Sequence, residues 1–471
     1  MTDRPLERVA KLMAARGLCS RREAERLIDA GCVLVDGAPV VAQGAKAAAD
    51  ADIRISDAGQ HLLGGRATVL LHKPVGIVST QPEPGQTPAW TLLRAASRRG
   101  PADAARERQV LADPQTQNAF EMDRFHAETV PALRRTVGEL GDVPLFGVGC
   151  GDIMYDDLAL YPEYERGVRA TGVPFFSVVG NHDLDQDGRT DEASTRTFAS
   201  RFGPTYYSFD RGEVHYVVLD DVFWHGAGYI GYLPATQLAW LAADLAHVER
   251  GRTVVVLLHI PLASSRPART GERAGAISEM VTNRAALYRL LEPYRAHVLA
   301  GHTHEHEHLF EGGVHEHVHG TVCGAWWSGD RCWDGTPNGF GVYEVRGSEL
   351  RWRYQATGRD AAARMDLHAP GAEPTAPGDL IANVWDWDPS WTVTWGEDGT
   401  RRGLMSRRRG LDPRCVAEQR GPDRPPRRAW VEPVPTDHLF HAPVSPDARE
   451  VTVEATDRWG ATHRATWRRP S

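Results

Sequence analysis

The feature that most constrains the fold of this chain is a series of short apolar runs, most of which are followed by a cluster of polar residues. Runs of this length, mostly without alternation, are typical of strands buried on both faces. Helix-like stretches such as 125–140 and 235–248 separate several of them. The six runs lie at 109–112, 145–149, 174–179, 214–219, 253–258 and 296–300. The pattern predicts an α/β fold with layered sheets and outer helices.

Polar residues directly follow five of these runs, which places them at the carboxyl ends of predicted strands, where open α/β sheets carry their sites. The five clusters are Asp113-Pro114-Gln115, Gly151-Asp152, Gly180-Asn181-His182-Asp183, His259 and Gly301-His302-Thr303-His304. Carboxylate, amide and imidazole ligands together suit Mn, Fe or Zn, and the absence of cysteine from the clusters excludes a thiolate site. The sequence therefore predicts a metal centre at this edge of the fold.

In this order, the clusters resemble the D-x-H, G-D, G-N-H-D, H and G-H-x-H pattern of calcineurin-like metallophosphoesterases, over residues 109–358. The resemblance implies that family's layered α/β/β/α sandwich and two divalent metal ions, Mn, Fe or Zn. It assigns Asp113, Gln115 and His304 to one ion, Asn181, His259 and His302 to the other, and Asp152 to both. Gln115 stands where the commoner pattern has histidine, so the first ion is expected to bind more weakly.

Two adjacent cations clamp a phosphoryl group and acidify a bridging water, so the resemblance implies that a metal-activated hydroxide cleaves a phosphoester substrate. His182 is next to the ligand Asn181, and we expect it to protonate the leaving alkoxide. Asp183 is the expected partner that orients His182 and raises its pKa. The identity of the substrate is not encoded in the loops 184–200 and 262–282, which carry no recognisable signature.

A basic segment near the amino terminus has a pattern of its own. The string GLCSRREAERLIDAGCVLVDGAPV (17–40) resembles the S4 RNA-binding module, with a hairpin turn predicted at Asp36-Gly37. The resemblance implies a small α+β domain over residues 1–65 and structured RNA as a partner. The expected RNA-binding residues are Arg8, Lys11, Ser20, Arg21 and Arg22. The alternative is that these basic residues form a solvated helix face.

The next segment, LLHKPVGIVST (70–80), resembles the opening strand of pseudouridine synthases. That family needs an aspartate in a G-R-L-D-type motif, and none follows. Asp191, in GRTDEAST, lies among the clusters of the other family and is interpreted as a decoy. Residues 66–108 are therefore expected to be a truncated synthase-like stub and linker, and a working synthase is disfavoured.

The carboxyl-terminal part is expected to be a linker at 359–380 and a small β-sandwich at 381–471, which resembles the C-terminal β domain of the same phosphoesterases. Within the histidine-rich tract 302–319, only His302 and His304 are expected to be ligands. The alternation in HEHVHG (315–320) suits the exposed face of an edge strand. Trp326 and Trp327 are expected in the core and not at the mouth of the site.

The composition, with 41% hydrophobic and 25% charged residues, is ordinary for a soluble globular protein, and the net charge of −8 argues against a chain devoted as a whole to nucleic acid. No stretch approaches the ~18 apolar residues of a membrane helix, so no membrane partner is expected. Six scattered cysteines and a charged start predict a cytoplasmic protein. Two functions stay open. One is a phosphoesterase with an added module, and the other is an S4 RNA-binding protein related to pseudouridine synthases, with the phosphoesterase as an accidental or regulatory fusion.

Overall fold

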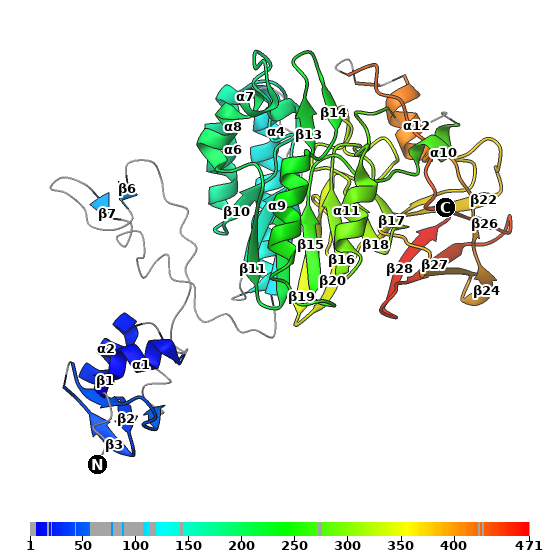
Figure 1. The fold of residues 1–471 in the computed structure, drawn as a ribbon. Coiled ribbons are helices and arrows are strands. Elements are labelled where there is room, and N and C mark those ends of the chain that lie inside the picture. Colours follow the sequence, from blue (N-terminus) through cyan, green and yellow to red (C-terminus); the bar gives the residue numbers. More distant parts are fainter. Residues whose placement is uncertain are drawn as a thin grey trace. The chain divides into compact units, whose positions relative to one another are not determined.

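The chain divides into two compact units, residues 1–98 and 99–471, and each is described by itself (Figure 1). The computed structural model describes residues 6–16, 18–19, 21–42, 44–56, 77–78, 87–88, 107–112, 119–141, 145–271, 276–422, 424–425 and 428–470. Of the expected stub and linker 66–108, most therefore lies outside the described residues. Its described part includes β6 (Ile77–Val78), which pairs in parallel with β7 (Thr87–Pro88).

The first unit packs two short helices against short strands. Its elements are β1 (Leu6–Arg8), α1 (Val9–Ala15), α2 (Arg21–Asp29), β2 (Val33–Val35), β3 (Ala38–Val40), β4 (Lys46–Ala48) and β5 (Ile53–Ile55). β2 pairs antiparallel with β3 and β5, and β1 pairs with β4. Asp36 and Gly37 both have positive φ, 47° and 82°, which is the tight turn that the sequence predicts. Met13, Ile28 and Val33 are buried in a small apolar core.

Two sheets form the centre of the second unit. The five-stranded sheet has the order β10 (Phe175–Ser177), β9 (Leu145–Gly149), β8 (Glu107–Ala112), β19 (Gly339–Arg346) and β20 (Glu349–Ala356). The six-stranded sheet has the order β11 (Tyr207–Arg211), β12 (Val214–Val218), β15 (Thr253–Leu257), β16 (Arg295–Ala300), β18 (Val314–Val318) and β17 (Glu307–Glu311). Strands β8, β9 and β10 are parallel, as are β12, β15, β16 and β18.

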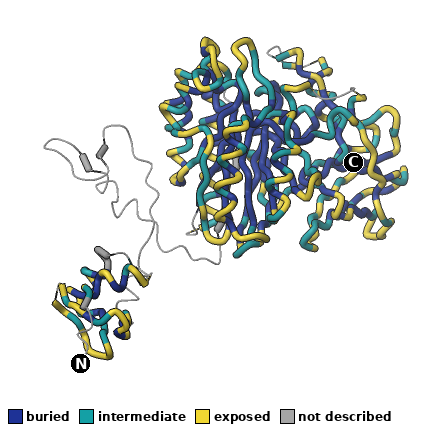
Figure 2. Tube along the Cα trace, in the orientation of Figure 1, coloured by how far each residue is buried: buried dark blue, intermediate teal, exposed yellow. Residues whose placement is uncertain are grey.

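Apolar side chains fill the space between the two sheets, and helices cover their outer faces. Phe146, Tyr216 and Leu257 belong to the cluster between the sheets, which appears as the dark interior of Figure 2. On the outer side of the six-stranded sheet, Leu241 of α9 (Ala235–Leu245) and Leu287 of α11 (Arg284–Leu291) pack in one core. The α/β/β/α sandwich expected from the sequence is therefore confirmed.

The helix expected over 125–140 is longer and less regular than its pattern suggests. It runs as α4 (Ala119–Arg124), a π-helical turn η3 (Phe125–Thr129) and α5 (Val130–Leu140). Other described helices of the α/β part are η4 (Leu158–Leu160), α6 (Tyr161–Ala170), η5 (Asn181–Asp183), α7 (Asp191–Ser194), α8 (Arg196–Phe202) and α10 (Arg266–Thr270). Among the described helices, none combines the length and the apolar character needed to cross a bilayer.

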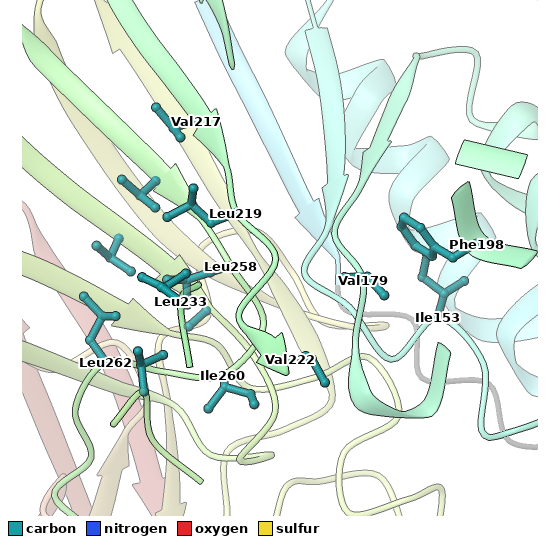
Figure 3. Close-up of a cluster of buried hydrophobic side chains, with 14 of the residues drawn as sticks. Ile153, Val179, Phe198, Val217, Leu219, Val222, Leu233, Leu258, Ile260 and Leu262 are labelled. Carbon is teal, nitrogen blue, oxygen red and sulfur yellow. The ribbon is translucent and has the colours of Figure 1, made fainter. Parts of the chain in front are cut away.

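Buried apolar residues hold the loops that carry the polar clusters. Ile153 follows Asp152, Val179 precedes Gly180, and Ile260 follows His259, and all three apolar side chains are fully buried. Figure 3 shows them within one apolar cluster, Ile153 and Val179 on one side and Ile260 on the other. The loops at the ends of β9, β10 and β15 are therefore fixed by their own neighbours in sequence.

The carboxyl-terminal region is a β-sandwich, as expected. One sheet has the order β21 (Met365–His368), β22 (Asp379–Val384), β26 (Leu439–Pro443) and β25 (Ser406–Arg407). The other has the order β24 (Thr400–Leu404), β23 (Thr392–Glu397), β27 (Glu450–Thr456) and β28 (Thr462–Arg468). The helix α12 (Pro413–Arg420) joins β25 to β26. The linker expected at 359–380 is corrected, because β21 lies inside that range and pairs with β22.

The histidine-rich tract does not form an exposed face. β18 lies between β16 and β17, and all five of its residues are buried. The expectation of an exposed edge strand for 315–320 is therefore wrong. The neighbouring strand β17 takes the edge position. The alternation of histidine with other residues in 315–320 does not indicate that another strand pairs on that side of β18.

Candidate active site

The loops after β9, β10, β15 and β16 lie around a cavity of about 180 Å³. Its lining residues are Asp152, Asn181, His182, Tyr229, Arg266, Ser278, Glu279, His302, Thr303, His304, Trp326 and Trp333. β9 and β10 belong to one sheet, and β15 and β16 to the other. The cavity is therefore built at the carboxyl-terminal edge of both sheets.

The backbone turns sharply where the polar side chains enter this region. Asp152, His302 and His304 all have positive φ, at 51°, 70° and 54°, a conformation that non-glycine residues adopt mainly where surrounding structure enforces it. Gly151 has a φ of 94°, and a Cβ there would lie 2.4 Å from His259 Nδ1. A Cβ on Gly180 would lie 2.0 Å from the Asp152 nitrogen. Only glycine fits at these two positions.

Three acceptor atoms converge on one nitrogen of His259. Its Nε2 lies 3.0 Å from Asn181 Oδ1, 3.3 Å from Asp152 Oδ1 and 3.0 Å from His302 Nδ1. Acceptor atoms that face one another at these distances repel, whereas a cation among them would satisfy every atom of the set. Ligand atoms of Asp152, His259 and His302 all lie within 4.8 Å of one another. The donor set therefore fits a divalent cation.

The second nitrogen of each ring fixes its tautomer. His259 Nδ1 lies 2.8 Å from the Cys150 carbonyl oxygen, and His302 Nε2 lies 2.9 Å from the Ser278 carbonyl oxygen. A carbonyl only accepts, so these nitrogens carry the protons. Burial and the neighbouring His259 lower the pKa of His302 to about 3, which leaves its ring neutral with a lone pair on Nδ1. Such outer hydrogen bonds are the usual way in which proteins orient metal-binding histidines.

Asp152 is an anion at the centre of this set. Burial alone would raise its pKa, but His259 and His182 outweigh that effect and hold the pKa of Asp152 well below its ordinary value. The carboxylate also accepts a hydrogen bond from the His182 backbone N–H at 2.9 Å. It is therefore ionised at neutral pH and available to a cation.

The ligands expected for the other metal ion are only partly described. Asp113 and Gln115 lie outside the described residues, so the structure does not place them. His304 is buried, its Nδ1 donates to the Gly324 carbonyl, and burial lowers its pKa to about 4. Its ring stacks on Trp326 with 4.0 Å between centroids. The structure thus brings Asp152, Asn181, His182, His259, His302 and His304 to one place.

His182 has a carboxylate partner that the sequence did not indicate. Its Nδ1 lies 3.0 Å from Asp156 Oδ1, and its ring lies 4.2 Å from the Tyr155 ring. Gln186 donates to the same Asp156 oxygen at 2.7 Å. Burial alone would lower the pKa of His182, but the nearby Asp152 and the bond to Asp156 raise it above the ordinary value. The His182 ring, which lines the cavity, is therefore easier to protonate than an ordinary histidine.

The expected pairing of Asp183 with His182 is corrected by the structure. The fully buried Asp183 carboxylate accepts hydrogen bonds from the backbone N–H groups of Ile153, Met154 and Gly180, at 3.1, 3.0 and 2.9 Å. The Tyr161 hydroxyl donates to it at 3.2 Å. Burial raises its pKa to about 7, although the amide donors act in the opposite direction. Asp183 ties the β9 and β10 loops together.

Several cavity residues have no signature in the sequence. Arg266 lies over the Trp333 ring, 4.4 Å from its centroid, and Glu279 lines the same cavity. Trp326 lines the cavity and stacks on His304, so its expected place in the core is wrong. The expectation holds for Trp327, which is buried in the main core. The decoy Asp191 accepts a hydrogen bond from the Trp224 backbone at 2.7 Å.

The residues expected to bind RNA are partly described. Arg8 is exposed, and Lys11 is exposed with its ammonium 3.1 Å from Glu7. Ser20 and the side chains of Arg21 and Arg22 lie outside the described residues. Another basic residue, Arg16, donates to the carbonyls of Ala51 and Ala49, both at 2.7 Å, which is a structural role within the unit.

Comparison with protein-family models gives three matches. The model described as calcineurin-like phosphoesterase matches residues 110–306, and the model for the C terminal of calcineurin-like phosphoesterase matches residues 316–463. The S4 domain model matches residues 7–42. In turn, the matches cover most of the cavity residues, nearly all of the β-sandwich and residues 7–42 of the first unit.

The similar proteins are of two kinds, phosphatases and pseudouridine synthases. Purple acid phosphatase 23 of Arabidopsis thaliana is 29% identical over 209 residues, which are 39% of this chain and 43% of the relative. The human serine/threonine-protein phosphatase CPPED1 is 30% identical over 139 residues, 27% of this chain and 43% of the relative. An uncharacterized RNA pseudouridine synthase of Rickettsia conorii is 33% identical over 79 residues, 17% of this chain and 34% of the relative. The chain thus spans less than half the length of each.

Proposed function

Because the chain belongs to the calcineurin-like phosphoesterases and also carries an S4 domain, we propose that its second unit hydrolyses phosphoesters at the cavity beside Asp152 and His182. The observation that carries this proposal is the convergence of Asn181 Oδ1, Asp152 Oδ1 and His302 Nδ1 on His259 Nε2. Purple acid phosphatase 23 and CPPED1, which are named as phosphatases, support the same reaction class.

The proposed cofactor is a pair of divalent ions of the Mn, Fe or Zn class. Asn181, His259 and His302 would hold one ion, Asp113, Gln115 and His304 the other, and Asp152 both. When bound, such a pair clamps the phosphoryl group and supplies hydroxide as the nucleophile at neutral pH. Imidazole ligands favour these transition metals over Mg²⁺, which prefers oxygen ligands.

The chain's own residues would act on the two ends of the scissile bond. His182, with its pKa raised by Asp152 and Asp156, would donate a proton to the leaving oxygen. Asp156 would hold the ring through Nδ1, which leaves Nε2 as the donor. The Arg266 guanidinium lines the same cavity and would bind a phosphoryl oxygen.

The test is hydrolysis of an aryl phosphate by the full chain. Chelation should abolish turnover, and Mn²⁺ should restore it. Asp152→Asn should remove nearly all activity, because it takes a ligand from both proposed ions. Asp187→Asn is the matched control, because this carboxylate lies on an exposed loop with 85% of its side chain accessible. Near-normal turnover of Asp152→Asn with metal still bound would refute the assignment.

For the first unit we propose a second function, binding of structured RNA through the exposed Arg8 and Lys11. Its support is the S4 model match over residues 7–42. Affinity for a structured RNA should fall steeply with salt, because phosphate contacts release counterions. Arg8→Glu with Lys11→Glu should weaken binding, whereas Arg54→Glu, an exposed basic residue of the same unit, should have little effect. Formation of new pseudouridine in the RNA would instead indicate the pseudouridine synthase activity that the sequence disfavours.

A further inference from the structure

Four histidines form a second cluster that shares no residue with the proposed active site. His297 lies on β16, His308 on β17, and His315 and His317 on β18; together they are called the histidine cluster. Trp352 of β20 contacts all four rings, with centroid distances from 4.5 to 6.0 Å. The cluster therefore lies between adjacent strands of one sheet and the opposing sheet.

The separation from the active site follows from strand geometry. His297 precedes the end of β16 at Ala300 by three residues, which is roughly 10 Å at about 3.3 Å per residue. The ligands His302 and His304 lie beyond that end. A metal ion at the histidine cluster would thus be a different ion from those proposed at the cavity.

The ring nitrogens of the cluster are spaced as metal ligands are. His297 Nδ1 lies 3.1 Å from His317 Nε2, and His308 Nδ1 lies 3.2 Å from His315 Nε2. One ligand nitrogen from each of His297, His315 and His317 lies within 4.8 Å of the others. Two nitrogens bound to one tetrahedral zinc at about 2.0–2.1 Å are about 3.3–3.4 Å apart. Small shifts would therefore open the cluster around an ion.

A buried carboxylate fixes the tautomer of one ring. His308 Nε2 lies 2.8 Å from Asp386 Oδ1, so Nε2 carries the proton and Nδ1 presents its lone pair towards His315. This carboxylate–histidine arrangement is the usual outer support of a metal ligand. His306 also contacts Asp386, at 3.0 Å, but its Nδ1 accepts from the Gly320 N–H at 3.2 Å. Both nitrogens of His306 are used, which excludes it as a ligand.

The other rings are neutral and loosely constrained. His317 is fully buried, and its Nδ1 has no hydrogen-bond partner, so nothing in the described structure fixes the proton on either of its nitrogens. Burial and the charge of Arg458 lower the pKa of His297 to about 4, and burial also lowers the pKa values of His315 and His317. Arg458 is itself paired with Asp388 at 3.0 Å. Neutral imidazoles are the form that binds metal.

From this geometry we propose that the histidine cluster is a structural site for one zinc ion or an ion of similar ligand preference. An all-imidazole set without carboxylates suits zinc and its neighbours and does not suit Mg²⁺ or Ca²⁺. The ion would join β16 and β18 through His297, His315 and His317, with His308 of β17 next to this group. It would also give the buried imidazole nitrogens a partner other than one another.

The test counts zinc per chain after chelation and reloading with Zn²⁺, using the full chain and elemental analysis. A variant with Asp152→Asn and His302→Asn removes active-site ligands and should still retain one tightly bound zinc. X-ray absorption on that variant should show imidazole nitrogen as the dominant ligand. Adding His297→Gln and His317→Gln should remove this zinc. The exposed His247→Gln is the matched control and should not.

The active-site variant keeps the proposal testable even if the cluster variant does not fold. Its melting temperature should rise on zinc loading, because an ion bound only by the folded state stabilises it. A variant that retains no zinc, or whose zinc has mainly oxygen ligands, would overturn the proposal. These outcomes do not depend on whether the cavity hydrolyses phosphoesters.

Discussion

His182 Nδ1 lies 3.0 Å from Asp156 Oδ1, whereas the Asp183 carboxylate is taken up by backbone amides. Asp156, which follows β9, and Asp183, which follows β10, thus have separate roles. One holds an imidazole at the wall of the cavity, and the other holds the loops. This division leads to opposite expectations for their variants.

His182→Gln should lower turnover of phenyl phosphate by roughly 10²–10⁴, the usual contribution of general acid catalysis. The loss should be much smaller for 4-nitrophenyl phosphate, whose leaving group needs no proton. Asp156→Asn should also lower turnover of phenyl phosphate more than turnover of 4-nitrophenyl phosphate, but by a smaller factor than His182→Gln. The exposed neighbour Asp157→Asn is the control. Equal losses on both substrates would contradict the acid role of His182.

Asp183→Ala should act mainly on stability. It leaves the buried amides of Ile153, Met154 and Gly180 without their carboxylate, and an unsatisfied buried donor costs roughly 1–3 kcal/mol. We expect a fall of about 3 kcal/mol or more in the free energy of unfolding, measured by urea denaturation. Unchanged stability together with a leaving-group-dependent loss of turnover would instead indicate that Asp183 is the carboxylate that orients His182.

Asp412 should make the β-sandwich sensitive to acid. Its carboxylate accepts from His368 Nε2 at 2.7 Å and Asn383 Nδ2 at 2.9 Å. Burial would raise its pKa, but His368 outweighs this and the pKa is about 2, below the ordinary 3.8. A depressed folded pKa stabilises the fold above about pH 4, and this stability is lost as the pH falls from about 4 to about 2.

The expected loss over that interval is roughly 2 kcal/mol, because a tenfold change in proton affinity corresponds to about 1.4 kcal/mol. Asp412→Asn should flatten the dependence of the unfolding free energy on pH between those values. An unchanged slope in this variant would show that the acid sensitivity comes from other groups.

The second unit should keep its activity when the first 98 residues are removed, because every described cavity residue lies in residues 99–471. Removing the β-sandwich as well should abolish folding. Asp386 contacts His306 and His308, at 3.0 and 2.8 Å, and His438 contacts Asp334 at 3.4 Å. Turnover and melting temperature of fragments 99–471 and 99–358 check this. A soluble, active 99–358 would contradict it.

Part of the fold was predictable because buried parallel strands leave a strong local signal. The runs at 145–149 and 253–258 coincide with β9 and β15, and the polar residues after them line the cavity or approach it. The assignment of strands to two sheets was not predictable, since β9 and β15 have similar apolar sequences and different partners. Strand pairing is set by tertiary contacts that no local pattern records.

The same limit applies to the site. The order of the clusters indicated Asn181, His259 and His302, because glycine turns and strand ends mark them. Asp156, which contacts His182, and Arg266 of α10, which lines the cavity, carry no such mark, because only the folded chain brings them there. The histidines of β18 alternate as residues of an exposed strand do, and only their pairing with β16 and β17 buries them.

The convergence of three acceptors on His259 Nε2 predicts a cation at that point. A crystal of the full chain reloaded with Mn²⁺, with anomalous data collected on both sides of the manganese absorption edge, tests this directly. We expect an anomalous peak within coordination distance of His259 Nε2, His302 Nδ1 and Asp152 Oδ1. Catalytically active crystals with no peak at that position would contradict it.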